Sequence, residues 1–173
     1  TFVFHNNDGF VKKADQFVKK QSGLNLGSLL HNRTTPYQLF VPAAPRYFIC
    51  ALRKPVNRTS QHTLNFRSQE DRDFAYLVLN SSLIYWWWRV RDGGMTLSLN
   101  TLHELPLPSK KKVSRALESA LLESEETNLV YKMNAGALQE NVKHSEALVK
   151  RLNKWILPDF ADLLLDCHKN SSL

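Results

Sequence analysis

The sequence is poor in cysteine and glycine. Its two cysteines, Cys50 and Cys167, are far apart and form no Cys-x-x-Cys pair, and its six histidines are scattered. Because protein metal sites repeat their Cys and His ligands at short spacings, the sequence predicts no metal site. Cys50 lies in an apolar run, where a free cysteine behaves as a small buried hydrophobic residue. This cysteine usage is typical of a protein from a reducing cytoplasm.

Catalytic motifs are missing as well. There is no Gly-x-Ser-x-Gly or His-Glu-x-x-His sequence, and no Asp or Glu stands two residues before a Lys. These absences argue against a nucleophile-elbow hydrolase, a zinc protease and a restriction-type nuclease, respectively. The glycines form no glycine-rich turn of the kind that binds nucleotide-like cofactors. We therefore predict no catalytic, metal-binding or cofactor-binding residue in this chain.

Long apolar runs and a targeting segment are also missing. The longest apolar run, residues 83–88, is far below the ~20 residues that a membrane-spanning helix needs. Residues 1–4 are soon followed by polar ones, which does not fit a signal peptide. We expect no membrane partner. Because the chain begins without Met in what reads as the end of a strand, we also expect it to be a fragment of a longer protein.

Acidic residues are scarce in the first third of the chain, and this makes the charge uneven. The net charge is +7, and residues 1–67 hold ten Lys and Arg against two acidic residues, a balance of +8. Residues 68–108 have a balance of −2 and residues 109–173 a balance of +1. A positive field of this kind points to a polyanionic partner for the first third. The alternative is a surface that only keeps the protein soluble.

The first part of the chain predicts a basic helix followed by a small sheet. Apolar positions at helical spacing between residues 10 and 20 are flanked by lysines. Strands are then predicted over residues 37–41, 46–52 and 62–67. The segment 46–52 is apolar on both faces, which is typical of a strand in the middle of a sheet. In the segment 62–67, Leu64 and Phe66 share one face.

A long aromatic helix should pack against this sheet. Ser68, with Asp71 three residues later, predicts a helix that begins at about Gln69. Asn80-Ser81-Ser82 marks either a kink or a second N-cap, and Gly93-Gly94 ends the helix. Three consecutive helical residues span about 200° of the circumference. The three tryptophans at 86–88 therefore cannot all face one core, and we favour packing in the core or between domains over base stacking.

The remainder predicts a different kind of structure. Residues 95–99 alternate as a short strand, and Asn100 should cap one turn before Pro106. Amphipathic helices are expected over about 113–131 and 148–164, separated by a break over 133–142, with a bend at Pro158. The predicted fold class is α+β: a small mixed or antiparallel sheet packed by a long aromatic helix, followed by a C-terminal antiparallel helical pair. The predicted units are residues 1–108 and a helical appendage, 109–173.

Two segments carry a resemblance to a known family. Residues 79–90 read Leu-Asn-Ser-Ser-Leu-Ile-Tyr-Trp-Trp-Trp-Arg-Val, and residues 105–108 read Leu-Pro-Leu-Pro. This pattern resembles the C-terminal target-recognition (specificity) region of bacterial N6-adenine DNA methyltransferases of the TaqI-like and type IIG restriction-modification group. Residues 46–49 (Arg-Tyr-Phe-Ile) and 68–74 resemble neighbouring parts of that region. The resemblance covers roughly residues 36–108.

This resemblance implies a DNA target-recognition domain from a bacterial cytoplasm. Its partners would be double-stranded DNA and a catalytic methyltransferase domain or subunit. The parent enzyme would use S-adenosylmethionine, but the chain has no Pro-Pro dipeptide and so lacks the family's adenine-gripping Asn/Asp-Pro-Pro-Tyr/Phe loop. We therefore expect this part to bind DNA and to perform no methyl transfer by itself. Whether the parent also cleaves DNA is left open.

The candidate DNA contacts are basic and amide side chains. Phosphate contacts are predicted for some of the cations Lys12, Lys13, Lys19, Lys20, Arg46, Arg53, Lys54, Arg58 and Arg67. Base contacts are predicted for Arg33, Asn57, Arg58, Gln61 and His62. Arg89 and Arg91 are expected to cap the carbonyl end of the aromatic helix, with phosphate contact as the alternative. The alternative function is a protein-interaction module whose helices dock a catalytic subunit, with an incidental basic surface.

Overall fold

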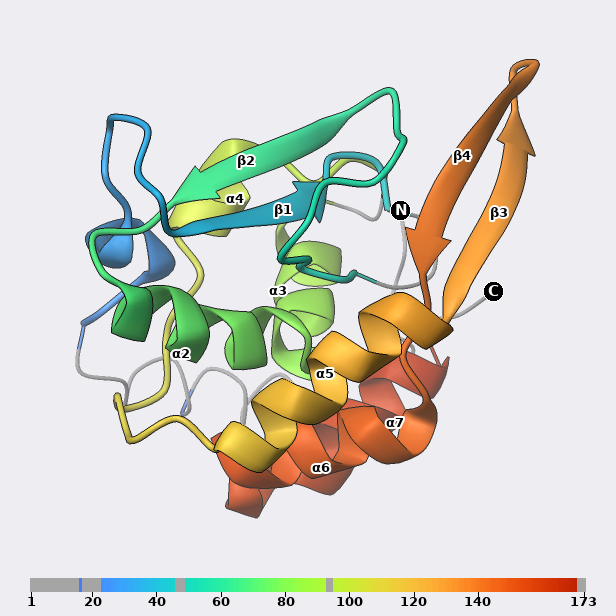
Figure 1. Ribbon diagram of the computed structural model, residues 1–173. Helices are drawn as coiled ribbons and strands as arrows, with labels where there is room; N and C mark the ends of the chain where they lie inside the picture. Colours follow the sequence, from blue (N-terminus) through green and yellow to red (C-terminus); the bar gives the residue numbers. More distant parts are fainter. Residues whose placement is uncertain (1–15, 17–22, 46–48, 93–94, 171–173) are drawn as a thin grey trace.

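The computed structural model describes residues 16, 23–45, 49–92 and 95–170. In these residues two antiparallel two-stranded sheets combine with several helices, so the predicted α+β class is confirmed. In Figure 1 the first sheet lies across the top of the molecule, most of the helices lie beneath it, and the second sheet projects at one side. A short 3-10 helix, η1 (Leu26–Leu29), precedes the first sheet.

The first sheet pairs β1 (Gln38–Pro42) with β2 (Gln61–Asn65), close to two of the predicted strands. Its apolar residues Leu39, Val41 and Leu64 are buried in the main core. On the opposite face Thr63 is exposed, and Gln38, Phe40, Gln61 and Asn65 are half-buried. This alternation is what the period-two pattern of the sequence predicts.

The predicted central strand over 46–52 is wrong for the part that the structure describes. From Ile49 onward, only Leu52 pairs with β1, through two backbone hydrogen bonds with Phe40 of 2.9 and 2.8 Å. The side chain of Asn80 instead bonds both the N–H (3.0 Å) and the carbonyl (2.9 Å) of Ala51. A buried backbone needs its polar groups paired, and here one amide side chain replaces the neighbouring strand.

The aromatic helix is two helices, α2 (Gln69–Leu79) and α3 (Ser82–Asp92). Ser68 caps α2 as predicted, accepting a hydrogen bond of 3.1 Å from the N–H of Asp71. The chain breaks at the Asn-Ser step, where Ser81 Oγ accepts from the N–H of Leu83 (3.2 Å). The N–H of Ser82 donates to Asn153 Oδ1 at 2.8 Å, so the start of α3 is held by a distant helix as well as by its own serine.

The predicted strand over 95–99 does not form. Ser98 is the N-cap of a short helix, α4 (Leu99–His103), and accepts from the N–H of Thr101 at 3.1 Å. Asp92 accepts from the N–H of Ser98 at 2.9 Å and fixes this turn against the end of α3. The cap is therefore Ser98 and not Asn100, because Ser98 alone combines extended backbone with a side chain aimed at the helix.

The C-terminal part contains a β-hairpin that the sequence did not predict. Helix α5 (Arg115–Thr127) ends at Thr127 instead of continuing to 131. Where the sequence predicted the end of this helix and a break over 133–142, the chain forms two strands, β3 (Leu129–Asn134) and β4 (Ala137–Val142). The two strands are paired along their whole length. Ala135 and Gly136 form the turn, both with positive φ (50° and 79°). Such a two-residue turn matches the twist of the strands that it joins.

Three helical segments follow the hairpin: α6 (Glu146–Ile156), the 3-10 turn η2 (Pro158–Phe160) and α7 (Ala161–Asn170). The predicted bend at Pro158 is a full break, because the residue before proline is driven out of the helical region, and Leu157 has φ −140°. Helices α5 and α6 pack against each other, with the hairpin between them in sequence. One hydrophobic cluster runs from Leu26 to Leu164 and includes residues on both sides of position 108.

Candidate nucleic-acid interface

The tryptophans at 86–88 lie in the core. Their exposed fractions are 5%, 5% and 0%, so the expectation of packing over base stacking is confirmed. Their spread around the helix is accommodated because α3 contacts α2, α4, α6 and α7. The indole N–H of Trp87 donates to the carbonyl of Thr101 (2.8 Å), and that of Trp88 donates to the carbonyl of Thr96 (2.9 Å). The aromatic block is therefore a buried support for the surface around it.

Two arginines, Arg89 and Arg91, pack against the tryptophans at the C-terminal end of α3. The guanidinium of Arg91 lies 4.4 Å from the ring centroid of Trp87, and one of its nitrogens is 3.7 Å from a carboxylate oxygen of Glu104. The guanidinium of Arg89 lies 5.9 Å from the Trp88 centroid. Both residues lie in the last turn of α3, where positive charge is favoured by the helix dipole.

Arg53 is a structural residue. Its guanidinium bonds the buried carboxylate of Asp73 at 2.9 Å and lies 5.1 Å from the ring centroid of Tyr76, and its side chain is only 17% exposed. Arg72 and Arg115 bond the same carboxylate at 2.9 and 2.8 Å. Burial opposes the charge of Asp73, but the bonds from Arg115 and Arg72 and the charge of Arg53 hold its pKa below the ordinary value. The charge of Arg53 is thus already balanced inside the protein.

The candidates between residues 54 and 62 are mostly used internally. Asn57 is exposed, but its backbone N–H donates to Glu140 (2.8 Å) and its side-chain amide to the carbonyl of Leu138 (3.4 Å). The guanidinium of Arg58 donates to the side chain of Asn141 and to the carbonyl of Ala44. These bonds tie the loop to β4, and two further bonds hold the start of β2: Gln61 to the carbonyl of Val56 (3.2 Å) and His62 to the carbonyl of Leu97 (2.7 Å). Lys54 is exposed.

Arg33 and Arg67 come together at the other end of the first sheet. The N–H of His31 donates to the carbonyl of Asn65 (2.8 Å), which brings the loop 31–36 beside the end of β2. Arg67 Nε donates to the carbonyl of Leu30 at 3.1 Å. His31, Arg33 and Arg67 are all exposed, and we name these three residues the basic corner. Figure 1 shows the loop standing beside this end of the sheet.

Five predicted contacts, Lys12, Lys13, Lys19, Lys20 and Arg46, lie outside the described residues. Two polar residues beside the basic corner were missed. Gln38 and Asn65 face each other across β1 and β2, and their amides are joined by a hydrogen bond of 2.8 Å. Polar residues that share the outer face of two paired strands are the signal that could have identified them, but the pairing register was needed to bring them together.

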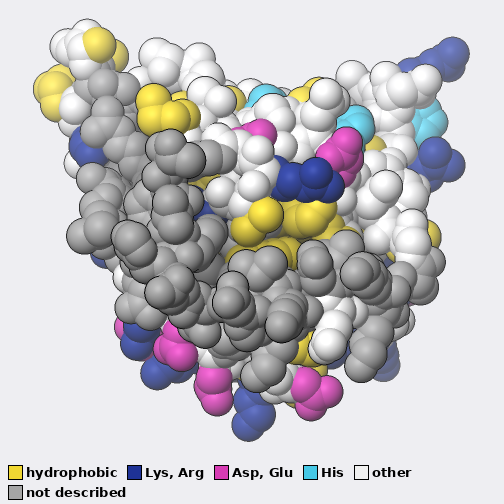
Figure 2. All heavy atoms as spheres, turned by 180° about the vertical axis from the view of Figure 1, so that it is seen from behind, with side chains coloured by type: hydrophobic (Ala, Val, Ile, Leu, Met, Phe, Trp, Pro, Cys, Tyr) yellow, Lys and Arg dark blue, Asp and Glu magenta, His cyan; other side chains and the backbone are white. Residues whose placement is uncertain are grey.

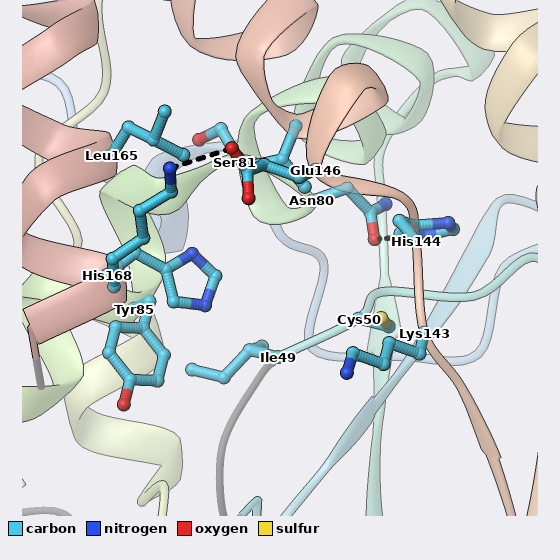
Figure 3. Close-up of a pocket in the computed structure, with 12 residues that line it drawn as sticks. Ile49, Cys50, Asn80, Ser81, Tyr85, Lys143, His144, Glu146, Leu165 and His168 are labelled. Atoms are coloured by element: carbon cyan, nitrogen blue, oxygen red, sulfur yellow. Dashed lines mark hydrogen bonds and ion pairs between the residues drawn. The ribbon is translucent and has the colours of Figure 1, made fainter. Parts of the chain in front are cut away.

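A pocket of about 390 Å³ lies between the loop at Ile49, the residues that follow β4, and α7. Figure 3 shows His144 beside Asn80 at its wall, with the carboxylate of Glu146 paired to Lys169 (2.8 Å). Burial lowers the pKa of His144 to about 4 and raises the pKa of the Cys50 thiol to about 12. At neutral pH His144 is therefore uncharged and Cys50 is a thiol, which is a poor nucleophile.

His144 belongs to a chain of buried hydrogen bonds. Ser124 Oγ lies 2.7 Å from His144 Nδ1, and His144 Nε2 lies 3.1 Å from Asn80 Oδ1. Because Asn80 Oδ1 is an acceptor, Nε2 carries the proton and Nδ1 accepts from Ser124. This chain links α5, the residues after β4 and the α2–α3 junction, and we assign it a structural role.

No protein-family model, curated protein or solved structure matches this chain. Within the described ranges, no three His, Cys, Asp or Glu residues are grouped so that they could hold a metal ion. None of the helices in those ranges combines the length and the apolar character needed to cross a membrane.

Proposed function

We propose that this chain is the DNA-recognition part of an N6-adenine DNA methyltransferase or of a combined restriction-modification enzyme. It binds duplex DNA and positions it for a methyltransferase domain or subunit that carries S-adenosylmethionine. The observation that carries the proposal is the balance of +8 over residues 1–67, the part of the chain that includes the first sheet and the loops at its ends. The resemblance of residues 79–90 and 105–108 to the target-recognition region supports the same conclusion.

The exposed cations of the described residues fit this role. Arg33 and Arg67 lie beside one end of the first sheet, and Lys54 lies in the loop that leads back to its other end. The sheet is five residues long in each strand, or about 14 Å. Cations at two separated points on a duplex would set the position and direction of the protein, without reading sequence.

Fluorescence anisotropy with a random-sequence duplex tests the proposal. With about four phosphate contacts, raising the salt concentration from about 50 to 200 mM should weaken binding roughly 100-fold. The triple variant Arg33→Ala, Lys54→Ala, Arg67→Ala should bind more weakly and show a shallower salt dependence, by about 0.9 for each lost contact. Arg53 is excluded from this variant because its loss would remove one of the three guanidinium partners of the buried Asp73 and could destabilise the fold.

The matched control removes three exposed cations from the other half of the molecule, with Lys150→Ala, Arg151→Ala and Lys154→Ala on α6. Its net charge equals that of the first variant, so a general charge effect would weaken both alike. Equal weakening would contradict the assignment of binding to the first sheet. If the unchanged protein fails to bind DNA at low salt, the proposed function is wrong.

One observation favours the docking function as a second candidate. Four large hydrophobic side chains of the β3–β4 hairpin are exposed: Val130, Tyr131, Met133 and Leu138. Figure 2 shows hydrophobic side chains on a projecting corner of the molecule, at the upper left, where the hairpin seen in Figure 1 lies after the turn. Exposed apolar strands of this kind are typical of protein contacts. If this function holds, Met133→Ser with Leu138→Ser should abolish co-purification with the methyltransferase subunit while leaving DNA affinity unchanged.

A further inference from the structure

The amides of Gln38 and Asn65 have fixed orientations. Asn65 Oδ1 accepts from the backbone N–H of Thr35 (3.2 Å) and from Gln38 Nε2 (2.8 Å). Because a backbone N–H only donates, the Asn65 atom that faces it must be the oxygen. Because that oxygen only accepts, the Gln38 atom that faces it must be the nitrogen. The backbone of Thr35 therefore decides which way both amides point.

This arrangement leaves one acceptor and one donor available on two amides that are joined by a hydrogen bond of 2.8 Å. Gln38 Oε1 and the amino group of Asn65 form no hydrogen bond with any of the residues that the structure describes. Both side chains are half-buried, and the exposed Thr63 stands two residues before Asn65 on the same face. An adjacent acceptor and donor match adenine, whose N6 amino group donates and whose N7 accepts in the major groove.

The two ends of the first sheet differ in how the described residues cover its outer face. At the other end, Phe40, Pro42 and Gln61 border a small gap closed by Arg58, Asn141 and Val142. The root of the second sheet and the loop before β2 therefore cover the outer face there. Among the described residues, the part of the outer face left for a ligand is the end at which Gln38, Thr63 and Asn65 lie.

The surroundings select duplex nucleic acid as the ligand. The basic corner adjoins the amide pair, and residues 31–36 include no acidic side chain, which suits a backbone of phosphates. Proteins that hold single strands stack the bases on exposed aromatic rings. Of the described aromatic residues beside the pair, Phe66 is buried and Tyr37 and Phe40 are half-buried. The guanidinium of Arg72 lies 5.9 Å from the ring centroid of Tyr37.

We infer that the Gln38–Asn65 amide pair reads the major-groove edge of an adenine, with the basic corner holding the neighbouring phosphates. This inference rests on the proposed function and names the residues that would give the DNA binding its sequence preference. Adenine N6 donates to Gln38 Oε1, and the amino group of Asn65 donates to adenine N7. The major groove is wide enough to admit a two-stranded ribbon such as β1–β2.

Selection from a duplex library with a randomised core tests the inference. The unchanged protein should enrich sites that share an A·T pair at one position. Gln38→Met keeps the length of the side chain and removes its hydrogen-bonding groups, so preference at that position should fall by roughly 5- to 100-fold. Its affinity for random duplex at low salt should not change. Gln69→Met is the matched control, because Gln69 is an exposed glutamine on α2.

A second variant separates base reading from folding. Asn65→Asp keeps the oxygen that bonds Thr35 and Gln38 but replaces the donor with an acceptor. Two acceptors match cytosine N4 better than adenine, so the selected position should shift from A towards C. The inference is overturned if Gln38→Met selects the same bases as Gln69→Met, or if Asn65→Asp changes the base preference at no position. In either case the proposed DNA binding is unaffected. If the unchanged protein binds no library DNA at low salt, the proposed function fails first.

Discussion

The two sheets of this protein are both antiparallel pairs, but they are stabilised in different ways. The first sheet buries Leu39, Val41 and Leu64 in the main core. The second is held at its root, where Val142 and Leu129 pack against Cys50 and Leu52 in a small separate cluster. Its outer half exposes most of its large apolar side chains. Pairing alone therefore does not determine what a sheet contributes, and the decisive factor is whether a third element covers it.

This difference also separates the two candidate surfaces. The open end of the first sheet carries amides and cations held in place by backbone hydrogen bonds, which suits the reading of a polar ligand. The outer half of the second sheet carries apolar side chains, of which Met133 is 65% exposed. Such a surface suits a protein partner.

Matched leucine substitutions should give the largest difference between the sheets. Leu64 is 2% exposed in the first sheet and Leu138 is 50% exposed in the second. Leu64→Ala should lower the free energy of unfolding by about 3 kcal/mol, because it leaves a cavity in the main core. Leu138→Ala should lower it by less than about 0.5 kcal/mol. Urea denaturation measures both, and equal losses would show that the second sheet is covered in solution.

Lowering the pH should weaken the root of the second sheet. Burial lowers the pKa of His144 to about 4, against 6.5 in an unfolded chain. The unfolded state therefore binds the proton more tightly, and the stability present above pH 6.5 is lost as the pH falls towards 4. Between pH 7 and pH 5 the loss should be about 2 kcal/mol.

Urea denaturation of the unchanged protein and of His144→Gln at these two pH values checks this prediction. The variant should be less stable at pH 7 but should lose much less on acidification. His103→Gln, at an exposed histidine on α4, is the control and should retain the full pH dependence. A loss that persists in His144→Gln would assign the effect to other groups.

The smallest predicted effect concerns the turn of the second sheet. Ala135 has φ 50°, a conformation that costs a residue with a side chain roughly 1–2 kcal/mol, whereas Asn adopts it more readily. Ala135→Asn should therefore raise the stability of the hairpin by up to about 1 kcal/mol. Hydrogen exchange of the amides of β3 and β4 should slow by the corresponding factor.

Exchange in β1 and β2 provides the internal control for this variant. It should slow only if the hairpin opens together with the main core. A uniform change in both sheets would thus contradict the separate stabilisation described above, and faster exchange in β3 and β4 would contradict the strain assigned to Ala135.

The sequence predicted correctly those elements that depend on residues close to them in the chain. The Ser68 cap and the strands near 38–42 and 61–65 depend on neighbouring residues, and the structure has them close to where they were expected. The effect of Pro158 was also placed correctly, although the predicted bend is a full break. The predicted strand over 46–52 and the helix extending to 131 were wrong. In the first case Asn80, a distant residue, bonds the backbone. In the second, β4 supplies the partner that turns residues 129–131 into a strand.

The predicted DNA contacts also divide into residues that the sequence placed correctly at the surface and residues that distant partners engage. Arg33, Lys54 and Arg67 are exposed, as an interface requires. Arg53 and Arg58 are engaged by Asp73 and Asn141. Composition cannot distinguish these two groups, because a buried carboxylate and a surface phosphate attract the same side chain.

By itself the sequence determined the α+β class, the uneven charge and the burial of the aromatic block at 86–88, because composition and periodicity control which side chains leave water. The tertiary structure decided which cations remain at the surface and which amides stand together. Gln38 and Asn65 are far apart in the chain, and only the register of β1 with β2 and the backbone of Thr35 make them one donor–acceptor pair. Such pairing depends on long-range contacts, which no local pattern encodes.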